Sequence, residues 1–250
     1  MLKQLLPLGV GAVVALGACQ NAGHVTLTAD EQAAWSQVFD SPAAHAMDIR
    51  LYEQGKRVGD AAIRFDALHH MLAREPENLA VTDSLAQLYF QSRMYGPSLA
   101  LTDDLLEGNA DDPRLLEMRA VAQNSLGLLE DALASYESLL RVDPNPYFAY
   151  QIATLQYGLN RFDIAEASVD NMLAGDLSGE SVNINIAGGR AQTVPMKAAL
   201  LNIKGVLRKD VHDDLETAKQ YFQLAMAEAP NFVLANNNLR LVGAKQTAAN

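Results

Sequence analysis

Residues 127–144 of the chain read GLLEDALASYESLLRVDP. A glycine opens this stretch and a proline closes it. Between them Ala132, Tyr136 and Leu139 follow one another at intervals of four and three residues. This spacing places the three side chains on one face of an α-helix, and Gly127 and Pro144 suit the turns that flank it. The stretch therefore predicts an amphipathic helix that packs through a small, an aromatic and an aliphatic residue.

The same pattern recurs along the chain at a constant interval. Steps of 34 connect apolar positions of successive helical stretches: Met71, Leu105, Leu139 and Leu173. They also connect the breaks between pairs of such stretches: Gly59, Arg93, Gly127 and Arg161. Four blocks result, beginning near His45, Leu79, Pro113 and Tyr147, and a fifth covers residues 197–230. A fixed period of this length is typical of stacked helical hairpins.

The third block resembles the tetratricopeptide repeat (TPR), a helix–turn–helix unit of about 34 residues, in its turn glycine, small, aromatic, apolar and closing proline positions. The resemblance implies an all-α fold, a solenoid of about five helical hairpins. Small residues then allow the two helices of a hairpin to approach closely: Ala86, Ala120, Ala132 and Ala218. Since no hairpin buries its apolar face alone, stacking supplies the core. We assign residues 45–180 to repeats 1–4 and 197–230 to repeat 5.

Helices are also predicted at both ends of the repeats. Thr28 and Glu31 have the spacing of a capping box, so residues 28–44 are assigned to an N-terminal helix, a short one that Ser41 and Pro42 end. Residues 231–250 are assigned to a capping helix, which ends near Ala244, and a frayed tail from Lys245. Polar residues beside Phe232 give this last helix the outer face that ends a solenoid.

An insertion of residues 181–196 interrupts the helical pattern. Ser181–Ile186 alternates polar and apolar residues, Gly188 and Gly189 follow, and Ala191–Pro195 suits a returning strand. This pattern predicts a β-hairpin. An isolated hairpin is marginally stable in water, which leaves two interpretations: a hairpin packed on the edge of the solenoid, or an exposed strand that pairs with a strand of a partner.

Residues 1–18 have the features of a signal peptide. Lys3 is followed by an apolar run from Leu5 to Leu16, which is too short to span a bilayer. The run ends in Leu16-Gly17-Ala18-Cys19, which resembles the bacterial lipobox. That resemblance implies cleavage before Cys19, lipidation of its thiol and acylation of the new amino terminus.

Several acyl chains make membrane anchoring effectively permanent. Gln20, rather than Asp, follows the cysteine, and under the enterobacterial sorting rule this implies the outer membrane. Residues 19–27 then form a tether that spans at most about 30 Å. We therefore expect the folded body to lie in the periplasm, close to the membrane.

Composition excludes several classes of function. The chain has 250 residues, a formal net charge of −11 and one cysteine. The charge argues against nucleic-acid binding, because affinity for phosphates comes mostly from Lys and Arg. One cysteine forms no internal disulfide and no multi-cysteine metal site. No His-Glu-x-x-His zinc motif and no Gly-x-Ser-x-Gly nucleophile motif occurs. We therefore predict no enzyme activity, no metal and no cofactor.

Resemblance to the TPR family implies a concave groove, lined by the first helix of each hairpin, that binds peptides or partner domains. The groove candidates of the second repeat are Asp83, Gln87, Phe90 and Gln91. Those of the third are Arg114, Glu117, Val121 and Asn124. The chaperone-binding members of the family clamp a C-terminal carboxylate with Lys, Arg and Asn, and here only Arg114 and Asn124 are of these types.

Two further features have alternative interpretations. Tyr147, Tyr150 and Tyr157 lie near one helical face. The strict register places the last two in the core, which we favour, whereas a shift of one residue places them in the groove. The densest acidic stretch is either a solvated helix end or a landing site for a basic partner, and it consists of Asp103, Asp104, Glu107, Asp111 and Asp112.

The sequence thus predicts an outer-membrane-anchored protein that binds protein or peptide partners of the cell envelope. Its layout of lipobox, short tether and several repeats resembles pilus-assembly, secretin-pilotin and barrel-assembly lipoproteins, so a scaffold or assembly factor for an envelope complex is our first hypothesis. An adaptor for periplasmic cell-wall enzymes is the alternative. An enzyme with an unrecognised site is a third.

Overall fold

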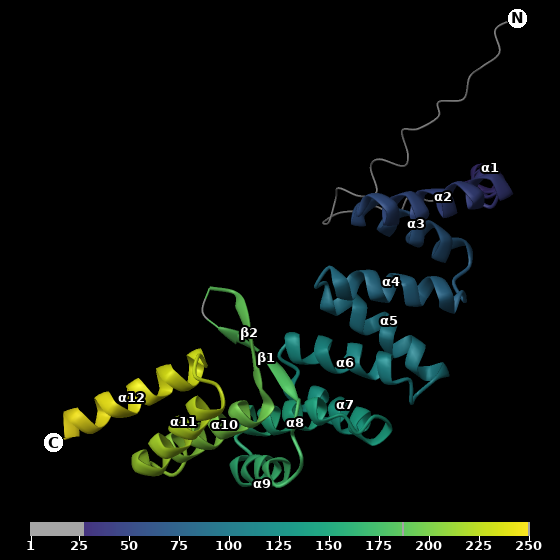
Figure 1. Ribbon diagram of the computed structural model, residues 1–250. Coiled ribbons are helices and arrows are strands. Elements are labelled where there is room, and N and C mark those ends of the chain that lie inside the picture. Colours follow the sequence, from purple (N-terminus) through teal and green to yellow (C-terminus); the bar gives the residue numbers. More distant parts are fainter. Residues whose placement is uncertain (1–27, 187, 250) are drawn as a thin grey trace, which may run out of the picture. The chain divides into compact units, whose positions relative to one another are not determined.

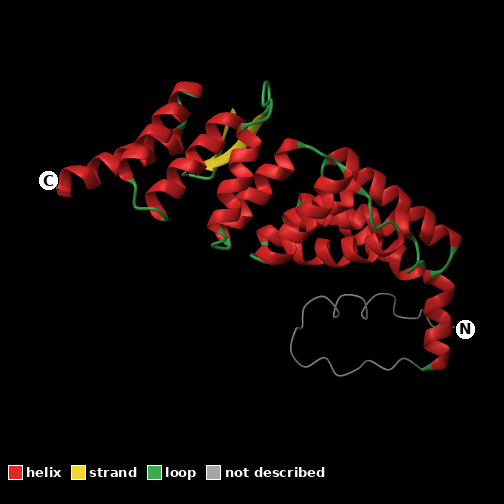
Figure 2. Ribbon diagram, turned by 90° about the horizontal axis from the view of Figure 1, so that it is seen from below, coloured by secondary structure: helices red, strands yellow, loops and turns green. Residues whose placement is uncertain are grey.

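The computed structural model describes residues 28–186 and 188–249. The predicted signal peptide (1–18), Cys19 and the tether (19–27) lie outside the described residues. Helices predominate, with one antiparallel β-hairpin (Figures 1 and 2). The predicted fold class, an all-α stack of helical hairpins with a small β-hairpin, is confirmed. No helix in the described ranges is both long and apolar enough to cross a bilayer. The chain divides into two compact units at Pro76.

The first unit contains three helices: α1 (Ala29–Phe39), α2 (Pro42–Val58) and α3 (Ala61–Arg74). The predicted capping box at the start of α1 is present, since Thr28 and Glu31 bond reciprocally. As predicted, α1 ends just before Ser41 and Pro42, and the segment assigned to residues 28–44 also contains the first residues of α2. The Ser41 side chain accepts a hydrogen bond from the Ala44 amide, and Pro42 occupies a position that needs no amide donor, so a new helix starts there.

Arg74 connects the helices of the first unit. Its guanidinium group pairs with the buried Asp48 carboxylate, donates to the Phe39 carbonyl at 3.2 Å and lies 4.8 Å from the centre of the Phe39 ring. Nδ1 of His70 lies 3.2 Å from the same carboxylate. A buried carboxylate without such partners would be strongly destabilising. The end of α1 is therefore held against α2 and α3 by one cation.

The second unit stacks four helical hairpins and a last helix. The hairpins are α4 (Leu79–Gln91) with α5 (Tyr95–Gly108), α6 (Pro113–Ser125) with α7 (Leu129–Val142), α8 (Pro146–Gly158) with α9 (Phe162–Leu173), and α10 (Met196–Asp210) with α11 (Leu215–Glu228). The last helix is α12 (Val233–Ala249). Consecutive hairpins share their apolar faces, so the core is continuous between them.

One residue with positive φ lies in the turn between the two helices of each hairpin. At Gly59, Arg93 and Gly127 this residue recurs at the period found in the sequence, but in the next hairpin it is Asn160 rather than Arg161. Asparagine adopts the left-handed conformation more readily than arginine does. The hairpin of α8 and α9 is therefore shifted by one residue relative to the period of 34 residues. This shift changes the face of the helix on which each α8 side chain lies.

The helices of each hairpin meet where side chains are smallest. The four alanines predicted to permit close approach are all fully buried. In the last hairpin the approach is closer still, because Gly205 of α10 lies directly against the ring of Phe222 in α11. A Cβ atom at position 205 would lie 2.6 Å from Cδ1 of that ring.

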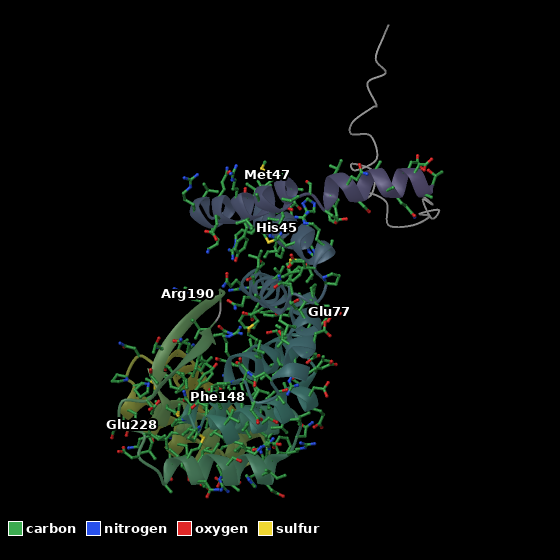
Figure 3. The ribbon with its side chains drawn as sticks, turned by 90° about the vertical axis from the view of Figure 1, so that its right-hand side faces the viewer. His45, Met47, Glu77, Phe148, Arg190 and Glu228 are labelled. Carbon is green, nitrogen blue, oxygen red and sulfur yellow. The ribbon has the colours of Figure 1, made fainter. Side chains whose placement is uncertain are left out.

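The β-hairpin packs on the C-terminal helices. Val182 of β1 (Ser181–Ile186) pairs with Val194 of β2 (Arg190–Pro195), and both are 2% exposed. Gln192 donates to the Asn231 carbonyl at 2.6 Å and accepts from the Val233 amide at 3.0 Å, so it binds the start of α12. The interpretation of a packed hairpin is confirmed for this face. Arg190 lies at its far end (Figure 3).

The predicted frayed tail from Lys245 is wrong as far as Ala249, because α12 continues to that residue. The segment Ala244–Ala249 contains alanine, lysine and glutamine, which favour a helix, and neither glycine nor proline. At the start of the helix the expected division holds, with Phe232 and Ala235 buried and Asn236 and Asn237 exposed.

Gly205→Ala is expected to lower the free energy of unfolding by about 1–3 kcal/mol, because the added methyl group overpacks the contact with Phe222. Gly108→Ala is the matched control. Gly108 is the last residue of α5, with open space around its Cα atom, so alanine should be neutral or slightly stabilising. Chemical denaturation measures both variants. Equal stabilities of the two would contradict the close approach of α10 and α11.

Candidate partner-binding groove

A surface depression of about 340 Å³ lies between α4 and α6, the first helices of two successive hairpins. Its lining consists of Gln87, Phe90, Gln91, Arg114, Glu117 and Met118. Five of these were predicted as groove residues, and the structure brings them together in one place. We call this feature the α4–α6 depression. Its use by a partner stays a prediction.

Asp83 was also predicted as a groove residue. It lies at the edge of the α4–α6 depression and neutralises the charge of Arg114. Its carboxylate is 2.8 Å from the Arg114 guanidinium group and accepts a hydrogen bond of 2.8 Å from the Gln87 side-chain amide. Arg114 also contacts the Met118 sulfur at 3.5 Å. Because its charge is already paired, Arg114 is poorly placed to clamp a carboxylate of a partner.

Val121 and Asn124 lie farther along α6 and do not line the α4–α6 depression. Val121 is half-buried and packs against the core, whereas Asn124 is exposed. Met118 lines the depression but was not predicted. It is 6% exposed, and from sequence such an apolar residue is assigned to the core. Its position four residues after Arg114 was the one signal that placed it near the groove.

Glu117 is the unpaired charge of the α4–α6 depression. Burial raises the pKa of its carboxyl group above the ordinary value, and the nearby Asp143 charge raises it further. Among the described residues, no cation forms an ion pair with Glu117. Because the Glu117 side chain is also exposed, a carboxylate without a counter-ion is available to a ligand.

The one-residue shift of the hairpin of α8 and α9 decides on which face of α8 its tyrosines lie. Between α6 and α7 the Ser135 hydroxyl donates to the Gln123 side chain at 2.7 Å, and between α8 and α9 the Ser168 hydroxyl donates to the Gln156 side chain at 2.8 Å. The same contact thus recurs after an interval that is one residue shorter than the usual period. Tyr150 follows Glu117 by this same shortened interval and thus takes the equivalent place on α8. The strict register on which the core interpretation was based is therefore wrong, although Tyr150 still packs against the core.

The three tyrosines of α8 are half-buried rather than fully buried. Tyr147 and Tyr150 pack against the core while keeping part of their surface exposed, and burial raises the pKa of the Tyr150 phenol. The Tyr157 hydroxyl donates to Asp210 at 3.4 Å. The groove face of α8 is therefore aromatic, whereas those of α4 and α6 combine polar side chains with one apolar residue each.

No protein-family model and no curated protein matches the sequence. Among solved structures, a tetratricopeptide repeat protein from Parabacteroides merdae aligns with a TM-score of 0.60 and 19% identity, over 79% of this chain and 72% of the other. The fold is TPR-like. The TPR protein YrrB, described as having an unusual peptide-binding site, aligns with a TM-score of 0.58 and 13% identity, over 82% and 95% of the chains. MamA from Desulfovibrio magneticus aligns with a TM-score of 0.56 and 12% identity, over 76% and 97%.

The acidic stretch of this TPR-like chain serves partly structural roles. The Asp112 side chain accepts from the Arg114 and Leu115 amides and caps α6. Asp103 lies 3.9 Å from Arg119, and burial raises its pKa although that cation opposes the rise. No group of three metal-binding side chains gathers within the described ranges. A role in steering a basic partner stays a prediction.

Two ion pairs between α9 and α10 escaped sequence analysis. Glu166 pairs with Arg208, and Asp170 pairs with Lys204, so two charges spaced by one helical turn face two others. Burial opposes the charged form of Lys204, but its bonds to Asp170 and Tyr221 outweigh this and raise its pKa. His212 lies 3.1 Å from Glu166 and so has a structural partner.

Glu117→Gln is expected to stabilise the chain at pH 7, since it removes a carboxylate that the fold disfavours. A carboxyl group with a raised folded-state pKa binds more protons in the folded than in the unfolded chain, so it lowers stability as pH rises. The advantage of glutamine should be present above the raised pKa of Glu117 and absent below the unfolded-state value. Thermal unfolding at several pH values measures it. A gain that grows on acidification would contradict the raised pKa.

Proposed function

We propose that this protein is a binding scaffold of the bacterial cell envelope that captures a segment of a partner protein on its groove face. The observation that carries the proposal is the α4–α6 depression, in which polar and apolar side chains of two helices converge. The mechanism is binding without chemistry. Because the supporting helices are fixed by the stack, the face is formed before the partner arrives, and little ordering cost is incurred on binding.

The TPR-like fold supports this function, as does the peptide-binding site that the description of YrrB mentions for that protein. The groove faces of α4 and α6 offer amide and charged groups, and α8 adds half-exposed tyrosines. Such a mixture suits an extended peptide, whose backbone needs hydrogen-bond partners and whose side chains need contacts.

Anchoring is the second part of the proposal. The lipobox-like residues 16–19 support lipidation at Cys19, and Gln20 at the next position supports an outer-membrane location with the body in the periplasm. The short tether would keep the groove near the membrane surface. A partner captured there would be concentrated at the membrane, as expected for an assembly factor of a pilus- or secretion-type complex.

Crosslinking in intact cells, followed by mass spectrometry, tests the scaffold. The wild-type chain should recover the components of one envelope complex. The double variant Gln87→Arg/Gln91→Arg, which fills the α4–α6 depression with bulk and charge, should lose them. Ala134→Arg/Glu137→Arg changes exposed positions of the second helix α7 and should retain them.

Each outcome of the crosslinking experiment decides between the alternatives. Recovery of soluble cell-wall enzymes, lost in the same groove variant, would indicate the adaptor role instead. Equal recovery of abundant, unrelated proteins by all three chains would overturn a dedicated scaffold.

Cys19→Ser is expected to abolish lipid attachment and to block cleavage by the lipoprotein signal peptidase, because serine has no thiol to form the thioether. Mass spectrometry of the amino terminus and membrane fractionation measure this result. Cleavage and fractionation identical to those of the wild-type chain would show that the proposed anchor is wrong.

A further inference from the structure

The charges of the α4–α6 depression do not balance. Arg114 supplies the one cation of the lining, and Asp83 neutralises it at 2.8 Å. Glu117 supplies an anion that pairs with no cation among the described residues. The lining therefore presents one uncompensated negative charge, on a side chain that is itself exposed to solvent.

The remaining side chains narrow the chemistry of a ligand. Phe90 and Met118 provide apolar surface. The side-chain amide nitrogen of Gln87 is engaged by Asp83, which leaves its carbonyl oxygen as the group that can accept a bond. Hydrogen-bond acceptors and a carboxylate beside apolar surface suit a donor at the end of an aliphatic stem.

We propose that the α4–α6 depression binds one lysine or arginine side chain of the partner segment, with Glu117 as its counter-ion. The methylene groups lie against Phe90 and Met118, and the charged end reaches Glu117 and the Gln87 carbonyl oxygen. This inference rests on the proposed scaffold function and specifies the chemistry of its partner.

Size and electrostatics both favour this ligand over others. A volume of about 340 Å³ admits a lysine or arginine side chain but is too small for a folded element. An apolar side chain would bury the Glu117 carboxylate further without pairing it, at a cost in free energy. An acidic side chain would meet like charge at Glu117 and an arginine that is already paired.

Peptide pools provide the test. Four octapeptide pools share a randomised uncharged background and carry lysine, arginine, norleucine or glutamate at one central position. Their binding to the full-length chain in detergent is measured by fluorescence polarisation. The lysine and arginine pools should bind about fivefold more tightly than the norleucine pool, and the glutamate pool should bind most weakly.

Two matched variants locate the preference. Glu117→Gln should bind all pools equally, whereas Glu137→Gln, the same change at an exposed position of α7, should keep the wild-type ratio. High salt should reduce the ratio in the wild-type chain, because a partly exposed ion pair is screened. Thermal unfolding verifies that both variants fold.

The results separate this inference from the scaffold function. Equal binding of all pools, abolished by Gln87→Arg/Gln91→Arg, would overturn the basic-side-chain site while leaving a peptide groove in place. A preference that survives Glu117→Gln would also overturn it. If no pool binds at millimolar concentration the site is likewise wrong, and the crosslinking experiment decides on the scaffold by itself.

Discussion

The structure depends on how closely the two helices of each hairpin approach. Gly205 against Phe222 is the extreme case, and fully buried alanines take the same role in the other hairpins. A larger side chain at any of these positions would separate the helices and open the apolar faces on which the next hairpin stacks. The groove face follows from this constraint, because its shape is set by the spacing and tilt of successive first helices. The chemistry of the surface is therefore carried by a scaffold that tolerates little change inside.

Most of the fold could be predicted because its signals are local or periodic. The helix cap at Thr28, the glycine turn of the hairpin and the regular spacing of small residues all act within a few turns of chain. The groove residues of α4 and α6 came from the resemblance to the TPR family, carried over position by position. Such features need no knowledge of how distant segments meet.

The features that escaped prediction depend on contacts between distant segments or on small energetic differences. The shift of one residue in α8 was an open alternative rather than a missed feature, because the choice of Asn160 over Arg161 for the left-handed turn depends on a local preference of about 1–2 kcal/mol. Arg74 with Asp48, and the ion pairs between α9 and α10, join residues whose partners cannot be chosen among many charges before the helices are placed. Met118 was not predicted as a groove residue because its side chain is almost fully buried and still lines the depression.

The bond from Gln192 to the start of α12 has a consequence for how the chain unfolds. Repeat proteins contact mainly their sequence neighbours, so they tend to lose structure from an end, one repeat at a time. The β-hairpin departs from that scheme, since a residue inserted before α10 holds a turn that follows α11. Fraying of the last helix must break this bond as well as its own packing. The hairpin of α10 and α11 is thereby coupled with α12 into one cooperative unit, and the inserted β-hairpin stabilises the C-terminal end of the stack.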